Sequence, residues 1–102
     1  MIEMNEEQFR LAVADSRPIL VDFWAPWCVH CRRLAPALES LDGLTIPIAK
    51  INIDEEPELA KKEKIDVIPT LKIYREGKTL GSIVGPDSKA KIEEFIRSTL
   101  GE

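Results

Sequence analysis

The sequence predicts an α/β protein in which a βαβ-like unit is followed by two strands and a final helix. Two observations carry this prediction: helical and strand-like hydrophobic patterns alternate along the chain, and proline or glycine separates several of them. A chain of 102 residues is long enough for one hydrophobic core and too short for two domains of ordinary size. We therefore expect residues 1–102 to form a single domain.

Local signals predict the first three elements. Asn5 and Gln8 have the spacing of a capping box at the start of a helix over residues 5–15. The run 19–24 is almost continuously apolar, as in strands that are covered on both faces. From Cys28, apolar residues recur at three- and four-residue steps, so a second helix is predicted to start at the cysteines.

Proline, glycine and alternation predict the remaining elements. Pro36 falls inside the second helix, where it should bend the helix, and Gly43 should end it. The pattern then predicts a strand at 46–53, a helix at 57–64 with proline in its first turn, strands at 70–75 and 79–84 around the turn 76–78, and a final helix capped by Asp87 or Ser88.

Composition and charge argue against several classes of function. The net charge of -4 lacks the basic excess of proteins that bind nucleic acid or anionic membranes. No apolar run approaches the roughly 20 residues of a membrane span, and the first ten residues do not resemble a signal peptide. We expect a cytoplasmic protein whose partners are proteins or small molecules. The chain has no coiled-coil heptads, so we expect a monomer.

The two cysteines of the chain are separated by only two residues, as Cys28-Val29-His30-Cys31. A disulfide that closes so short a loop adds little stability, so a purely structural bridge explains the pair poorly. A structural zinc site normally needs four protein ligands, and the sequence offers two thiols, one histidine and no second Cys-x-x-Cys motif. No metal is therefore expected.

Helix geometry favours a redox role for this pair. Residues three apart lie on nearly the same face of a helix and within disulfide reach. Cys28 lies at the helix start, where unpaired backbone N–H groups favour a thiolate, so it is the predicted nucleophile. Cys31 lies about one turn further in, and is placed to attack a mixed disulfide on Cys28 and release the reduced partner.

The segment Trp24-Ala25-Pro26-Trp27-Cys28-x-x-Cys31 resembles the thioredoxin family. Further matches occur along essentially the whole chain, at Val21-Asp22-Phe23, Pro36, Lys50, Ile68-Pro69-Thr70 and Gly85. The resemblance implies a thioredoxin fold, with a central mixed sheet of four or five strands flanked by helices on both faces. It also implies a thiol–disulfide oxidoreductase that uses its Cys28–Cys31 disulfide and no other cofactor. Disulfide-containing client proteins and a reductase-type electron donor are the implied partners.

The resemblance assigns roles to three residues outside the cysteine motif. Asp22 has apolar neighbours and is expected to be buried, which would raise its pKa and let it exchange a proton with Cys31. Lys50 either extends to solvent, as lysines in strands commonly do, or lies near Asp22 and tunes that carboxyl. Most peptide bonds before proline are trans, so the residues alone predict a trans Ile68–Pro69 bond. The resemblance instead implies a cis Ile68–Pro69 bond that faces the cysteines.

An apolar rim for extended client peptides is expected around the cysteine pair. Its predicted members are Trp27, Ile68, Pro69, Val84 and Gly85, and in the family the backbone beside the cis proline pairs with the client strand. Trp24 is expected to be a plain core residue, the commoner fate of tryptophan.

The chain departs from the family pattern between its cysteines, where Val29-His30 replaces the usual Gly-Pro. A histidine at this position resembles protein disulfide isomerases and periplasmic dithiol oxidases, in which it stabilises the thiolate; the alternative is a solvated surface histidine. Val29 would crowd the client surface over Cys28. Asp66-Val67 also replaces the Arg-Gly or similar pair often found before the proline, which bears on recognition by a reductase.

Three functions remain open from the sequence. A cytosolic reductant of client disulfides is favoured by the match over the whole chain. A disulfide oxidase or isomerase is favoured by His30. A non-enzymatic binding subunit would make the cysteines incidental, which the intact Cys-x-x-Cys motif argues against.

Overall fold

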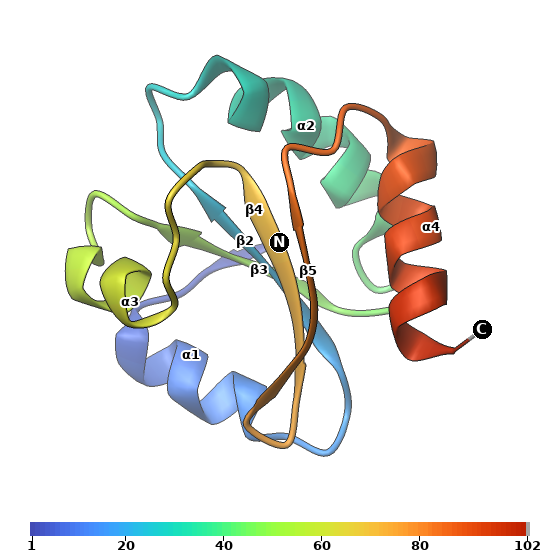
Figure 1. The fold of residues 1–102 in the computed structure, drawn as a ribbon, viewed down its shortest axis with the longest axis horizontal. Coiled ribbons are helices and arrows are strands. Elements are labelled where there is room, and N and C mark those ends of the chain that lie inside the picture. The colour runs from blue at the N-terminus through green and yellow to red at the C-terminus, as the bar shows by residue number, and fades with distance from the viewer. Residues whose placement is uncertain (102) are drawn as a thin grey trace.

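A computed structural model describes residues 1–101, and its five strands form one mixed sheet in the order β1-β3-β2-β4-β5. The elements are β1 (Ile2–Glu3), α1 (Glu6–Val13), β2 (Ile19–Trp24), α2 (Val29–Leu41), β3 (Ile48–Asn52), α3 (Pro57–Lys62), β4 (Thr70–Arg75), β5 (Lys78–Val84) and α4 (Lys89–Leu100). Strands β1 and β2 run parallel to β3, whereas β4 is antiparallel to both β2 and β5. Helices α1 and α3 lie on one side of the sheet, and α2 and α4 on the other (Figure 1). The expected mixed sheet with helices on both faces is confirmed.

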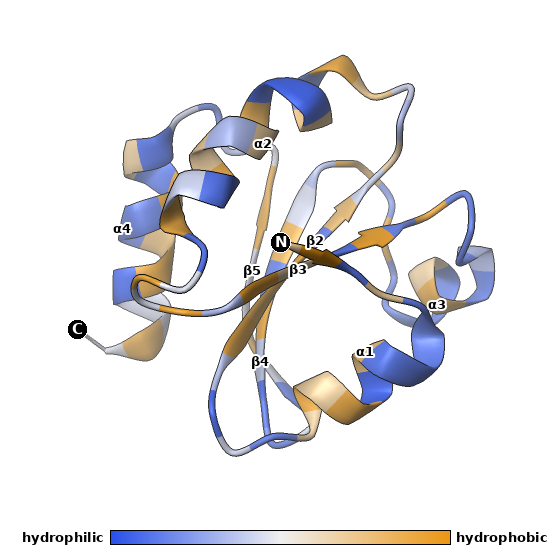
Figure 2. Cartoon of the chain, turned by 180° about the vertical axis from the view of Figure 1, so that it is seen from behind, coloured by the Kyte–Doolittle hydropathy of each residue, from blue (hydrophilic) through white to orange (hydrophobic). Residues whose placement is uncertain are grey.

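The central strand β2 divides its side chains between two hydrophobic cores. Ile19, Val21 and Phe23 belong to the core under α1 and α3. Leu20 belongs to the core under α2 and α4. Because successive side chains of a strand point to opposite faces, Asp22 follows Leu20 on the α2 side. Most residues of the central strands are hydrophobic, whereas hydrophobic and hydrophilic residues alternate along the helices (Figure 2).

The sequence predicted the limits of β2 and β4 correctly and overestimated the length of three other elements. Helix α1 ends at Val13, strand β3 begins only at Ile48, and helix α3 ends at Lys62. Contacts with the β4–β5 hairpin explain the end of α1: the backbone N–H of Gly77 donates to Val13 O at 2.8 Å. Helix α3 cannot continue far, since Lys64 has a positive φ of 57°.

The β4–β5 turn is tighter than the sequence predicted. Glu76 and Gly77 both have positive φ, at 54° and 77°, as the central residues of a type I′ hairpin turn require. Lys78 therefore already pairs with Arg75 and belongs to β5 rather than to the turn. Strand β1 was not predicted at all, because two residues are too few to show an alternating pattern.

The helix ends agree with the cap signals in the sequence. Asn5 and Gln8 form the predicted capping box of α1. Ser88 rather than Asp87 caps α4, and its Oγ accepts the backbone N–H of Lys91 at 3.2 Å. Helix α2 continues through Pro36. None of the helices within residues 1–101 is long and apolar enough to cross a membrane.

Truncation of Leu38, a fully buried residue of α2, tests the core under α2 and α4. We expect Leu38→Ala to lower the free energy of unfolding by about 2–5 kcal/mol, because the lost side chain leaves a cavity. Leu11→Ala is the matched control: Leu11 is 70% exposed, so the change should stay within about 0.5 kcal/mol. Urea denaturation measures both, and equal effects would contradict this assignment of the core.

Candidate active site

Cys28 and Cys31 are joined by a disulfide at the N-terminus of α2, with 5.2 Å between their Cα atoms. Cys28 is the N-cap, and its Sγ accepts the backbone N–H of Cys31 at 3.1 Å. Cys28 is 8% exposed and Cys31 is 3% exposed, so the first sulfur lies nearer to solvent. Unpaired N–H groups and the positive end of the helix dipole favour negative charge at this end of α2.

The loop before β4 lies against the disulfide and contains the cis bond Ile68–Pro69. The Ile68 O atom is 3.9 Å from Cys28 Sγ. Pro69 O accepts the backbone N–H of Gly85 at 2.8 Å, which ties the loops at the ends of β4 and β5 together. The cis bond is confirmed. Pro69 itself is fully buried, so it adds no exposed area to the apolar rim of which it was a predicted member.

The apolar rim around the disulfide is broader than predicted. Trp27 is 63% exposed, and Val84 is also exposed, whereas Ile68 and Gly85 are half-buried. Val29, the first residue of α2, is exposed on the side of the cysteines where it was predicted to crowd the client surface, and Val67 in the loop before β4 is a further exposed apolar residue. Val67 was missed, although an apolar residue next to Ile68 was a usable signal.

An acidic residue in the turn after β3 binds the Trp27 indole. The indole Nε1 of Trp27 donates to Asp54 Oδ2 at 2.9 Å. No local pattern predicted this contact, because the partners are 27 positions apart and only the β2–β3 pairing brings them together.

Asp22 is buried, as predicted, and shares a small cavity with Cys31. It is 3% exposed, and the cavity, of about 220 Å³, is also lined by Lys50 and Trp24. Desolvation raises the pKa of Asp22 to about 7, while the charge of Lys50 opposes the rise. Among residues 1–101, Asp22 Oδ1 is a buried side-chain atom without a hydrogen-bond partner. A carboxyl group in this state can accept or donate a proton near neutral pH.

Lys50 of β3 and Trp24 at the end of β2 line the same cavity beside Asp22. Lys50 is paired in register with Asp22, and its Nζ lies 4.5 Å from the centre of the Trp24 ring. The Trp24 Nε1 atom donates to the Glu3 carboxylate at 3.1 Å. Trp24 is half-buried, so the prediction of a plain core residue was wrong. An indole N–H needs a polar partner, and here that partner lies at the edge of the sheet.

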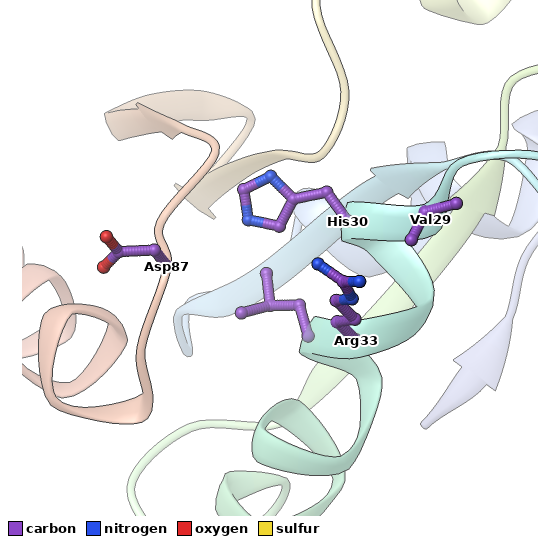
Figure 3. A pocket seen from close by; sticks show the side chains of 5 residues that line it. Val29, His30, Arg33 and Asp87 are labelled. Carbon is purple, nitrogen blue, oxygen red and sulfur yellow. The ribbon is translucent and has the colours of Figure 1, made fainter.

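His30 is half-buried and lies against the loop between β5 and α4. Its Nε2 is 2.9 Å from Pro86 O, and because a carbonyl oxygen only accepts, Nε2 must carry a proton. Val29, His30 and Arg33 of α2 line a pocket of about 510 Å³, with Asp87 of the loop on the opposite wall (Figure 3). The imidazole is thus engaged by the protein rather than freely solvated.

Comparison with known proteins places these features in a family. Residues 1–98 match the family model Thioredoxin. Thioredoxin from Streptomyces clavuligerus is 42% identical over 92 residues, covering 87% of this chain and 86% of that protein. Thioredoxin from Bacillus subtilis is 40% identical over 103 residues, covering 98% of both proteins.

A solved structure of Plasmodium falciparum thioredoxin superimposes with a TM-score of 0.89 at 26% identity, covering 96% of this chain and 98% of that one. Within the described part of the chain, no cluster of three or more His, Cys, Asp or Glu side chains could hold a metal ion. The fold, the Cys-x-x-Cys pair and the similarity over nearly the whole chain together show that this protein belongs to the thioredoxin family of dithiol–disulfide oxidoreductases.

Proposed function

We propose that this protein is a general cytoplasmic reductant of disulfides in client proteins. The observation that carries the proposal is the Cys28–Cys31 pair at the N-terminus of α2, with the buried carboxyl of Asp22 lining the same cavity as Cys31. The pair is oxidised in this structure, so a dithiol form must first be generated by an external donor. We propose a donor of the thioredoxin reductase type.

In the reduced protein, the Cys28 thiolate attacks one sulfur of a client disulfide. The Cys28–client bond forms as the client S–S bond breaks, and the other client sulfur leaves as a thiolate that takes up a proton. Cys31 then loses its proton, and its thiolate attacks Cys28 Sγ. The Cys28–Cys31 disulfide forms, and the second client sulfur leaves and is protonated. Two electrons pass from the protein to the client.

Asp22 is the proposed acceptor of the Cys31 proton. It lines the same cavity as Cys31, and a carboxyl with a pKa of about 7 is matched to proton transfer at neutral pH. Lys50, its partner in register on β3, would tune that carboxyl.

The exposed apolar rim is the proposed contact surface for extended client segments. Trp27, Val29, Val67 and Val84 supply its exposed apolar area, with Ile68 and Gly85 between them. Ile68 O lies beside the reactive sulfur, which supports pairing of a client strand with the backbone at this position. We expect the protein to act as a monomer.

A compartment that keeps thiols reduced suits this role. These 102 residues contain no cysteine outside the reactive pair, so the fold needs no oxidising environment. The alternative function is a disulfide oxidase or isomerase. It is favoured by one observation, the histidine within the cysteine motif at the start of α2.

Removal of the second thiol tests the two-step mechanism. We expect Cys31→Ser to lose catalytic turnover in an insulin-reduction assay and to accumulate a mixed disulfide between Cys28 and the client, because no second thiol can resolve it. Cys28→Ser should form no such adduct. Full turnover by Cys31→Ser would contradict the two-step mechanism, whereas absence of turnover by the wild type would favour a binding subunit.

Replacement of Asp22 tests the buried carboxyl through the pH dependence of stability. The folded pKa of about 7 lies above the ordinary aspartate pKa of 3.8, so the stabilising contribution is present at low pH and is lost as pH rises through 7. We expect the stability of the oxidised wild type to fall between about pH 4 and pH 8 relative to Asp22→Asn, by on the order of 4 kcal/mol. Urea denaturation across this pH range measures the difference.

An exposed carboxylate provides the control for this experiment. Asp87→Asn removes the same charge outside the core, where Asp87 is exposed. It should change the pH dependence little. If the free energy of unfolding depends on pH in the same way for the wild type and Asp22→Asn, Asp22 does not titrate as described.

Replacement of His30 tests the redox poise and the alternative function. We expect His30→Pro to lower the reduction potential of the couple and to move the thiol–thiolate titration of Cys28 to higher pH, because a group that stabilises the thiolate is lost. A tenfold change in the equilibrium corresponds to about 30 mV for this two-electron couple. Redox titration against glutathione measures it, with Val29→Gly as control. Equal potentials for wild type and His30→Pro would refute the role of His30.

A further inference from the structure

Three charged residues from three neighbouring strands form a single row across the sheet. Glu3 of β1 is the register partner of Lys50 in β3, and Lys50 is also the register partner of Asp22 in β2. Side chains paired in this way share one face of the sheet, and neighbouring strands lie about 4.8 Å apart. The row therefore places a lysine between two carboxylates on the side that faces α2.

The outer carboxylate is tied to the central lysine through Trp24. The Trp24 Nε1 atom donates to both Glu3 carboxylate oxygens, at 3.1 and 3.4 Å. The Lys50 ammonium lies over the same ring, 4.5 Å from its centre. Among residues 1–101, Lys50 forms no ion pair with either Glu3 or Asp22. The Lys50 ammonium thus lies over the indole ring, between the two carboxylates in the row, and is not directly paired with either of them.

The cavity below Cys31 connects this row to the redox pair. Asp22, Trp24 and Lys50 line it together with Cys31. The other charged groups that line it are Arg32 of α2 and Met1, whose amino group pairs with Asp42 at 3.0 Å. Strand β1 lies next to β3 at the edge of the sheet, and Glu3, which does not line the cavity, is connected to it through its contact with Trp24.

We propose that Glu3 is a positioning residue of the redox site, which holds Trp24 in place and shares the Lys50 ammonium with Asp22. The charge on Glu3 then sets how readily Asp22 binds the proton that Cys31 releases. The consequence for catalysis rests on the proposed function, whereas the coupling between the two carboxylates does not.

The signs of the interactions make the coupling testable. The charge of Glu3 raises the pKa of Asp22, and the charge of Lys50 lowers it. The pKa of Glu3 is itself raised by desolvation and lowered by Lys50 and by the Trp24 hydrogen bond, although much of the Glu3 side chain is exposed. Removal of Glu3 and removal of Lys50 should therefore move the titration of Asp22 in opposite directions.

The test is an NMR titration of the Asp22 carboxyl carbon in the disulfide form, in which no thiol titrates. Glu3→Gln removes the charge and keeps an oxygen that can accept from Trp24, so we expect Asp22 to titrate at lower pH than in the wild type. Lys50→Met should shift it to higher pH. Glu7→Gln, on the exposed surface of α1 on the other side of the sheet, is the control for net charge and should leave it unchanged.

Two further measurements separate the proposal from a merely structural role of Glu3. Glu3→Asp keeps the charge on a shorter side chain, so its Asp22 titration should stay closer to the wild type than that of Glu3→Gln even if the Trp24 contact weakens. In the reduced protein, the pH midpoint of client reduction should shift in Glu3→Gln, and Glu3→Gln should cause no further shift in an Asp22→Asn background.

The proposal is overturned if Glu3→Gln leaves the Asp22 titration where Glu7→Gln leaves it, or moves it in the same direction as Lys50→Met. This titration needs no client and no reductant. A protein that reduces no disulfide would therefore refute the proposed function and leave the coupling measurable.

Discussion

The position of β2 between β3 and β4 is the constraint on which the site depends. The carboxyl end of β2 leads to Cys28, and the antiparallel pairing of β2 with β4 sets Phe23 opposite Thr70, the residue after the cis proline. The pairing of β4 with β5 in turn sets Thr70 opposite Val84. Loops from distant parts of the chain therefore meet at the end of the sheet where β2 finishes, around one disulfide.

The same strand pairing decides the electrostatics of the site. Burial of Asp22 under α2 costs free energy whenever the carboxyl is ionised, and its unpartnered Oδ1 shows that the surroundings do not compensate for this cost fully. A structural role would be served better by an apolar side chain at this position. The proposed role of Asp22 as proton acceptor for Cys31 would account for a carboxyl here, and Lys50 and Glu3 are the charged residues paired beside it on the neighbouring strands.

Val29 and His30, between the two cysteines, add contacts that a Gly-Pro pair would not make. Val29 adds exposed apolar surface to the rim, and His30 connects the first turn of α2 to Pro86 in the loop after β5. A Gly-Pro pair would supply neither the apolar side chain nor the hydrogen bond. The motif thus contributes both to the exposed apolar rim and to the contact with the loop after β5.

The sequence by itself determined the alternation of elements, the capped start of α1, the start of α2 at the cysteines, and the cysteine pair, because these depend on local periodicity and on residues only a few positions apart. The family resemblance added the cis bond at Pro69. The burial of Pro69, the Trp27–Asp54 and Trp24–Glu3 contacts and the short strand β1 were decided only by the tertiary structure. These features arise from pairing between strands that are distant in the chain, and no local pattern encodes which side chains that pairing brings together.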